Sequence, residues 1–313
     1  MNARLGRGMR MLLPVLTAFA LTLAAVAASA EPDRPLSVRA PRAASAVGQA
    51  SVTACNPKAS SLRPSGPLQV TPGSFMEKIR ARGYLIAGVD QNTYHFGYFN
   101  PANGQIEGFD IDMIKAVARY IGVTKVEYKA ISDDQRIPDV ENGAVDIVAH
   151  TMTILCDRLK YVDFSSVYFD AGQRVLVLKS SAARSLAALA GQKVCATTGS
   201  DSLARIIAAR AIPVRVPYWT DCLVLLQQGD VAAISTDDTI LDGLKAQDPW
   251  TMLVGSRLSD EPYGLAISKQ HPDFVRFVNA VLEQLRSDGQ WAASYAHWIG
   301  HPVPAPPPAQ YAD

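Results

Sequence analysis

The segment "VDIVAHTMTILCDRLKYVDFS", at residues 145–165, decides the fold of this chain. It begins with a short apolar run and then passes into a polar stretch that holds two threonines, a cysteine and Arg158. A short apolar run of this kind is typical of a buried strand. In open parallel sheets, ligands bind beyond the carboxyl ends of the strands. The segment therefore poses the question of whether Arg158 is a solvated surface ion or the partner of a bound anion.

Strand and helix patterns alternate on the N-terminal side of this segment. Apolar runs predict strands at residues 84–89 and 123–129, and "GFDIDMIKAVARYIGV" has apolar residues at helical spacing. A short helix is expected at residues 133–142, before the strand at residues 145–149. Strand, helix, strand, helix, strand is typical of an α/β protein with a mainly parallel sheet.

The same pattern begins again at residue 173. Strands are expected at residues 173–178, 193–197, 213–217 and 231–235. Helices are expected at residues 185–189, 198–210 and 221–228, and from residue 241 onward. A further strand at residues 263–268 and two amphipathic helices within residues 272–298 follow. The sequence thus predicts two α/β units, and the pattern leaves open which unit the last elements extend.

The first thirty residues have the pattern of a secretory signal peptide. Arg4, Arg7 and Arg10 precede an apolar run at residues 12–27, and small residues follow up to Ala30. The alternative is a membrane anchor, because the run is nearly long enough to span a bilayer. The small residues and the lack of a basic stop after them favour cleavage after Ala30. An exported protein is therefore expected.

Two further segments lack apolar periodicity. Residues 31–74 are rich in Ala, Pro and Ser and are expected to be a flexible tether, and residues 301–313 form a proline-rich tail. The formal net charge is +1, with no basic block in the mature core, so nucleic acid is not expected as a partner.

Cysteine and histidine usage bears on bonds and metals. The chain has four cysteines in its exported part, which indicates two disulfides, and three pairings are open from the sequence alone. It has no Cys-x-x-Cys motif and no histidine pair at ligand spacing, so neither a metal site nor a cofactor is expected. No motif of a catalytic nucleophile was found, and no catalytic residue is predicted.

Four predicted strand ends carry polar groups. They are Asp90, the 151–158 segment, Thr198-Gly199-Ser200 and Thr236-Asp237-Asp238. An arginine and the N–H groups of a helix start suit a carboxylate, and an aspartate suits an ammonium, so together they suit an α-amino acid. Each group also has a purely structural explanation, such as a solvated arginine or a helix cap. Their recurrence at equivalent places in both units favours a binding site.

The chain resembles a known family from about residue 79 to residue 299. It is similar to the polar amino-acid family of bacterial extracellular solute-binding proteins, related to the glutamine- and glutamate-binding components of ABC importers. The segments that carry the resemblance are "LIAGVD", "GFDIDM", "VDIVAHTMTILCDRLKYVDFS", "STDDTIL", "PYGLAIS" and "FVNAVLEQLRSDGQW". It looks closest to the actinobacterial glutamate-binding branch, which also has cysteines at the positions of Cys156, Cys195 and Cys222.

The resemblance implies a two-lobed clamp of the periplasmic-binding-protein type II. Each lobe is then an α/β unit with a mixed, mainly parallel sheet flanked by helices. The first lobe comprises residues 75–174 and 262–300, because the late strand and helices return to it, and the second comprises residues 175–261. Both Cys195 and Cys222 fall in the second lobe, so we predict that they pair and that Cys55 pairs with Cys156.

The resemblance also implies roles for individual residues. Arg158 would hold the ligand α-carboxylate, with Thr153 adding its hydroxyl and N–H, and Thr151 its backbone. Ser200, in the stretch that begins at Thr198, would hold the same carboxylate when the lobes close. Asp237 would bind the α-ammonium, and Asp90 would lie near the ligand.

Ligand choice depends on the side-chain end of the site. An acidic side chain needs a second cation, because an unpaired buried carboxylate is costly. The candidates are His150 and Arg174, whereas Asp90 and Asp201 favour an amide or a basic side chain. Glutamate or aspartate is expected, then asparagine or glutamine, because the similar branch binds acidic amino acids and Arg174 follows its pattern.

The expected function is capture of an amino acid for an ABC permease by a monomer at the periplasm or cell surface. No lipid-attachment motif follows the apolar run. One alternative is a protein that signals to a membrane receptor. Another is an enzyme similar to cyclohexadienyl dehydratase, for which Glu261 would be the acid or base. Glu261 is, however, expected to be a solvated residue of the crossover between the lobes.

Overall fold

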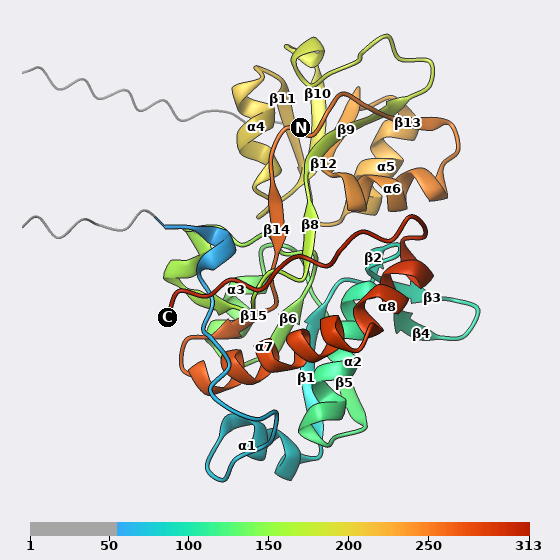
Figure 1. Ribbon diagram of the computed structural model, residues 1–313. Coiled ribbons are helices and arrows are strands. Elements are labelled where there is room, and N and C mark those ends of the chain that lie inside the picture. The colour runs from blue at the N-terminus through green and yellow to red at the C-terminus, as the bar shows by residue number, and fades with distance from the viewer. Residues whose placement is uncertain (1–54) are drawn as a thin grey trace, which may run out of the picture. The chain divides into compact units, whose positions relative to one another are not determined.

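The computed structural model describes residues 55–313, in which two five-stranded sheets form separate lobes (Figure 1). The predicted signal peptide and residues 31–54 of the predicted tether lie outside the described residues. None of the helices within residues 55–313 is both long and apolar enough to cross a membrane.

The sheet of the first lobe has the strand order β5–β1–β6–β15–β7. Its strands are β1 (Tyr84–Val89), β5 (Lys125–Ala130), β6 (Ile147–Ala149), β7 (Val162–Phe164) and β15 (Ala266–Ser268). Strands β5 and β6 pair with β1 in parallel, whereas β15 pairs antiparallel with both β6 and β7. The predicted strand at residues 263–268 is therefore interrupted, and only its second half, β15, enters this sheet. There it lies between β6 and β7, which come about a hundred residues earlier in the chain.

Helices and a small hairpin complete the first lobe. The helices are α1 (Phe75–Arg82), α2 (Phe109–Ile121), α3 (Arg136–Glu141), α7 (Pro272–Ser287) and α8 (Gln290–Trp298), with the short η1 (Pro57–Ala59) and η2 (Arg158–Lys160). The hairpin strands are β2 (Asn92–Thr93), β3 (Gly97–Asn100) and β4 (Gln105–Glu107). The apolar faces of α2 and α7 lie in one buried core with β1. Helix α2 ends at Gly122, whose φ of +90° suits glycine.

The sheet of the second lobe has the order β11–β10–β12–β9–β13. Its strands are β9 (Gln173–Leu178), β10 (Lys193–Thr197), β11 (Ile212–Val216), β12 (Ala233–Asp237) and β13 (Thr251–Val254). Its helices are α4 (Ser202–Ala208), α5 (Trp219–Gln228) and α6 (Asp238–Gln247), with the short η3 (Ala187–Leu189). Strands β10, β11 and β12 are parallel, and β9 is antiparallel to β12 and β13. This lobe has an apolar core of its own.

Two short strands connect the lobes. Strand β8 (Phe169–Ala171) lies between β7 and β9 in the chain, and β14 (Glu261–Tyr263) lies between β13 and β15. They pair antiparallel, and Figure 1 shows them side by side between the two sheets. We call this pair the linker ribbon. Because both crossings pass through it, a relative movement of the lobes would bend these strands.

The segment before α1 is fixed to the first lobe. The hydroxyl of Ser61 donates to Phe164 O at 2.7 Å and accepts from Asn279 Nδ2 at 2.7 Å, and all three side chains are buried. The C-terminal tail joins the same place, where Ala312 N donates to Ser61 O at 2.9 Å. The expectation of a flexible tether therefore does not extend to residues 55–74, because composition alone could not reveal these partners.

Two disulfides are present in the described residues. Cys195 and Cys222 join β10 to α5 within the second lobe, with their Cα atoms 5.5 Å apart. Cys55 and Cys156 join the start of the described chain to the loop that precedes Arg158, with Cα atoms 6.0 Å apart. These are the pairs that the assignment of cysteines to lobes predicted.

Candidate ligand-binding site

Arg158 is a buried cation and not a surface ion, which answers the question raised by its segment. It lies in η2 with 8% of its surface exposed. One guanidinium nitrogen donates to Thr153 O at 2.7 Å, within the first lobe. The other lies 3.4 Å from Gly199 O and 3.4 Å from Asp201 Oδ1, both in the second lobe. Burial lowers the pKa of Arg158, but a guanidinium remains charged in proteins.

A second buried arginine, Arg136, lies beside it and was not predicted from the sequence. It is in α3, and its Nη1 forms an ion pair with Asp133 Oδ1 at 2.9 Å. Its Nη2 lies 3.4 Å from Gly199 O, the same carbonyl that Arg158 reaches. The signal that could have found Arg136 is its position: it follows the carboxyl end of β5, at the sheet edge where Asp90 follows β1.

Carboxyl groups face these cations from the second lobe and the linker ribbon. Asp201 is 3.4 Å from Arg158 and 3.6 Å from Arg205 Nη1. Glu261, on β14, is 3.1 Å from Arg205 Nη1, and its Oε2 has no hydrogen-bond partner within residues 55–313. Glu261 is 1% exposed, so the interpretation of it as a solvated residue is wrong. Burial and the nearby Asp201 raise the pKa of Glu261 to about 7.

Asp237, at the end of β12, is also buried. Its Oδ2 accepts a hydrogen bond from the Tyr263 hydroxyl at 2.6 Å. Burial raises the pKa of Asp237 well above its ordinary value, and the neighbouring Asp201 and Glu261 raise it further. Asp201 stays ionised beside Arg158, whereas burial and neighbouring negative charge favour protonation of Asp237 and Glu261; a cation that entered beside Asp237 would favour its ionised form.

Asp133 and Thr197 make a further contact between the lobes. The Thr197 hydroxyl donates to Asp133 Oδ2. His150 lies beneath this contact, with Nδ1 at 3.4 Å from Asp133 Oδ1 and Nε2 at 2.9 Å from Ile131 O. His150 is therefore near the site, with its Nε2 engaged by Ile131 O, whereas its Nδ1 has no hydrogen-bond partner within residues 55–313. We call the residues that meet here the interlobe cluster: Asp133, Arg136, His150, Thr153, Arg158, Thr197, Asp201, Arg205, Asp237, Glu261 and Tyr263.

The two predicted threonines of the first lobe differ in what they can offer. Thr153 is buried, and neither its N–H nor its hydroxyl has a hydrogen-bond partner among the described residues. Thr151 has a φ of +43°, which is unusual for a threonine, and its N–H donates to Asp110 Oδ2 at 2.8 Å. The N–H of Thr151 is therefore already used, whereas both donors of Thr153 can reach a ligand.

Asp90 stabilises a turn. Its carboxylate accepts from the backbone N–H groups of Gln91 and Asn92 and from the Thr93 hydroxyl, at 2.5–2.8 Å. This pattern is that of an aspartate that holds its own loop. Asp90 therefore has three local donors, and none of its contacts joins it to the interlobe cluster.

In the second lobe, the stretch that begins α4 is only partly in the cluster. Thr198 is exposed, and its N–H donates to Val216 O at 2.9 Å. The side chain that reaches the first lobe is that of the preceding residue, Thr197. Ser200 is half-buried, and its hydroxyl accepts from Ser202 N at 3.2 Å. Asp201, which the sequence left undecided, faces Arg158.

Arg174 is not in the interlobe cluster. It lies on β9 opposite Thr236, whereas its neighbour Gln173 lies opposite Asp237. Paired residues lie on one face of a sheet and successive residues on alternate faces, so Arg174 and Asp237 lie on opposite faces. Its Nε donates to Gly255 O at 3.0 Å near the surface. The predicted role of Arg174 at the ligand side chain is therefore not supported by its position.

Buried charged groups from both lobes of an α/β protein meet between those lobes, and this defines a two-lobed ligand-binding protein of the periplasmic-binding-protein type II. Residues 85–301 match the family described as bacterial extracellular solute-binding proteins, family 3, and the chain belongs to this family.

Similar proteins agree with this assignment. The chain is 38% identical over 226 residues to the ABC transporter glutamine-binding protein GlnH of Bacillus subtilis (strain 168), covering 71% of this chain and 83% of that protein. The solved structure of an ancestral arginine-binding protein bound to glutamine is 36% identical to this chain, with a TM-score of 0.67. The match covers 70% of this chain and 99% of that protein. The ancestral amino acid-binding protein AncCDT-1, a precursor of cyclohexadienyl dehydratase, is 33% identical, with a TM-score of 0.67, covering 72% and 99%.

Proposed function

We propose that this protein captures a polar L-amino acid between its lobes and delivers it to an ABC importer at the outer face of the cell membrane. The observation that carries the proposal is the pairing of a buried cation, Arg158, with a buried acid, Asp237, in one interlobe cluster. An α-amino acid presents the two opposite charges that these groups need. Membership of an extracellular solute-binding family supports export and transport.

The α-carboxylate of the ligand would lie against Arg158. A guanidinium binds a carboxylate through two parallel hydrogen bonds, and the N–H and hydroxyl of Thr153 supply further donors. The contacts of Arg158 with Gly199 O and Asp201 are long, at 3.4 Å, and a carboxylate would displace them. The α-ammonium would lie against Asp237, which a positive neighbour would keep ionised.

The side chain of the ligand would meet Arg136. A glutamate or aspartate side chain needs a second cation, and Arg136 is buried, charged and directed at the same Gly199 carbonyl as Arg158. It takes the role for which Arg174 and His150 were considered. We therefore retain glutamate or aspartate as the proposed ligand. When the ligand binds, Asp133 would give up its ion pair with Arg136 and keep the contacts that it already has with the Thr197 hydroxyl and His150.

Glutamine or asparagine is the second candidate. Asp201 and Glu261 add negative charge beside Arg158 and would oppose an acidic side chain. A relative with 38% identity is named as a glutamine-binding protein. Calorimetry of the refolded protein against the twenty amino acids decides between the candidates. If no amino acid binds, the proposed function is wrong; if an amide binds tighter than both acidic amino acids, only the choice of side chain is wrong.

An enzyme is the alternative from another class, and Glu261 is the observation that favours it. A buried carboxyl group with a pKa of about 7 is suited to general acid or base catalysis. One solved relative is described as a precursor of cyclohexadienyl dehydratase. Turnover of prephenate by the purified protein, abolished in Glu261→Gln, would show that the protein is an enzyme and not a transport protein.

A receptor partner in place of a permease is the other alternative. The membrane protein that copurifies with the ligand-bound form distinguishes the two partners.

A further inference from the structure

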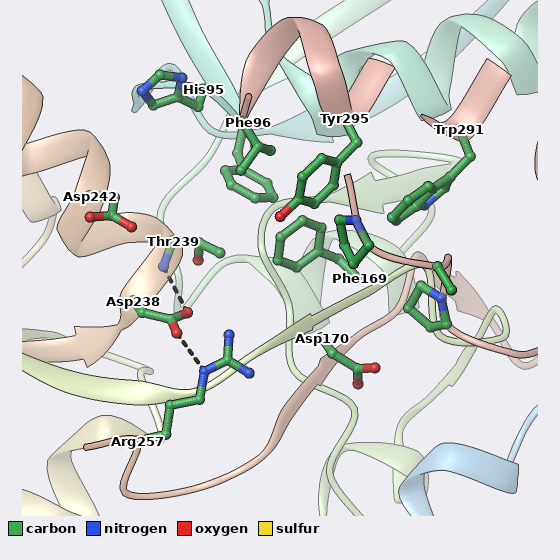
Figure 2. A pocket seen from close by; sticks show the side chains of 14 residues that line it. His95, Phe96, Phe169, Asp170, Asp238, Thr239, Asp242, Arg257, Trp291 and Tyr295 are labelled. Carbon is green, nitrogen blue, oxygen red and sulfur yellow. Dashed lines mark hydrogen bonds and ion pairs between the residues drawn. The ribbon is translucent and has the colours of Figure 1, made fainter. Parts of the chain in front are cut away.

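A cavity lies outside the interlobe cluster and shares no residue with it. Its volume is about 510 Å³, which is within the range of small-molecule sites. Figure 2 shows that side chains from both lobes, from β8 and from the C-terminal tail surround it. Tyr263 connects the cavity to the cluster: its hydroxyl donates to Asp237 at 2.6 Å and lies 2.7 Å from the hydroxyl of Thr239, a residue of the cavity wall. Its ring also packs against Phe96 and Phe169 of that wall.

One wall of the cavity is aromatic. Phe96, Phe169, Trp291 and Tyr295 line it, and Figure 2 shows their rings grouped on one side. The rings of Phe169 and Tyr295 stack with centroids 5.8 Å apart. The Tyr295 hydroxyl has no hydrogen-bond partner among residues 55–313. Pro307 of the tail is buried and closes this side, so a flat apolar group could pack here without exposing its faces to water.

The other wall is acidic. Asp238 is neutralised by Arg257, whose Nε is 2.6 Å from its Oδ2, and Asp170 has an ion pair with Lys58 at 3.4 Å. Asp242 has no ion pair within the described residues. His95 adds no positive charge at neutral pH, because burial lowers its pKa. Lys245 and Arg174 act on Asp242 only from a distance, so its carboxylate, across the cavity from the aromatic rings, is the one on this wall without a direct ion pair within the described residues.

Because one wall of the cavity is aromatic and the other is acidic, we infer that the cavity is a second ligand site, for a monocationic aromatic amine. The ring would pack against Tyr295, the half-buried aromatic residue of that wall, and the ammonium would lie against Asp242. A doubly charged amine would leave one charge unpaired, and an anion would meet net negative charge.

The experiment uses three probes with one skeleton: phenethylamine, 2-phenylethanol and phenylacetate. Calorimetry with the amino-acid-free protein is expected to show binding of phenethylamine, weaker binding of phenylethanol and none of phenylacetate. Asp242→Asn should weaken phenethylamine binding about two- to fivefold, the upper part of the usual range for a partly exposed ion pair. Asp230→Asn, at an exposed acid of the same lobe, is the control and should leave binding unchanged. Ala305→Trp, which adds bulk at the cavity wall, should abolish it.

Phenethylamine also carries an ammonium that Asp237 could bind, so the two sites must be separated. If Asp237→Ala abolishes its binding and Asp242→Asn does not, the amine occupies the interlobe cluster and the inference is overturned. Equal binding of all three probes, or none of phenethylamine, overturns it as well. These outcomes are independent of the proposed function, because the twenty amino acids are tested separately.

Discussion

Tyr263, on the linker ribbon, donates its hydroxyl proton to the carboxylate of Asp237 at 2.6 Å. The acid proposed to bind the ligand ammonium is thereby joined to the strand through which the lobes are connected. Burial and the adjacent Asp237 raise the pKa of Tyr263 well above its ordinary value, so the tyrosine stays a donor. A ligand that changes the charge of Asp237 therefore acts directly on the linker ribbon.

Removal of Arg158 should abolish tight binding. Loss of one partner from a buried charged pair costs about 2–5 kcal/mol, so Arg158→Ala should weaken amino-acid binding by about thirtyfold or more. Isothermal calorimetry measures this. Arg174→Ala is the matched control, because Arg174 is a guanidinium on the opposite face of the second sheet from Asp237. If Arg158→Ala and Arg174→Ala lose the same amount of affinity, Arg158 does not bind the α-carboxylate of the ligand.

Arg136 should determine the choice of side chain. Arg136→Gln removes the second cation but keeps a hydrogen-bond donor, so the affinity for glutamate should fall at least about tenfold more than that for glutamine. Competition calorimetry gives both affinities. A uniform loss for the two ligands would show that Arg136 supports the shape of the site and does not contact the side chain.

Amino-acid affinity should decrease at acidic pH because of Asp237. Its pKa is raised in the free protein by burial and then by Asp201 and Glu261, whereas the ligand ammonium requires its ionised form. Binding must therefore expel a proton wherever Asp237 is protonated, and affinity falls as the pH falls through that raised pKa. Titrations between about pH 8 and about pH 5 follow the loss. In Asp237→Asn the affinity should be weak and its pH dependence reduced; an unchanged profile would assign the dependence to another group.

Stability of the ligand-free protein should respond to Glu261 in the opposite sense. Its pKa rises from 4.5 to about 7 on folding, so the folded state holds this proton more tightly than the unfolded state does. The stabilisation is present below pH 4.5 and is lost as the pH rises to about 7, by at most about 3 kcal/mol. Urea unfolding across this interval measures it. Glu261→Gln should make the slope smaller and raise stability at pH 8, while Asp110 and Asp237, whose pKa values burial also raises, keep part of it; an unchanged slope in the variant contradicts the assignment.

The disulfide between Cys195 and Cys222 should stabilise the second lobe. It closes a loop with a sequence separation of 27, for which the chain-entropy model gives about 3–4 kcal/mol. The double variant Cys195→Ala with Cys222→Ala should unfold at a markedly lower urea concentration than the intact protein. Peptide mapping without reductant checks the pairing, and a peptide linking Cys195 to Cys55 would refute it.

Several elements of the fold could be predicted from local pattern. Strands β1, β9 and β10 have the bounds that apolar runs predicted, because a strand buried on both faces needs apolar residues along most of its length. The two-unit organisation followed from the repetition of that pattern. The choice of Arg158 as a candidate also followed, because ligands of open parallel sheets bind beyond the carboxyl ends of the strands.

Relations between distant residues depended on the tertiary structure. The sequence pattern left open that β15 would lie between β6 and β7, and that Arg136 and Arg158 would reach the same carbonyl of the second lobe. The placement of Arg174 depended on strand register, since one residue of difference moves a side chain to the other face. Glu261 looked like a loop residue until its burial was known. The sequence by itself determined which segments form strands and helices, because each segment's apolar spacing reflects the faces it buries. Only the tertiary structure decided which charged groups meet, because packing and register between distant segments place them.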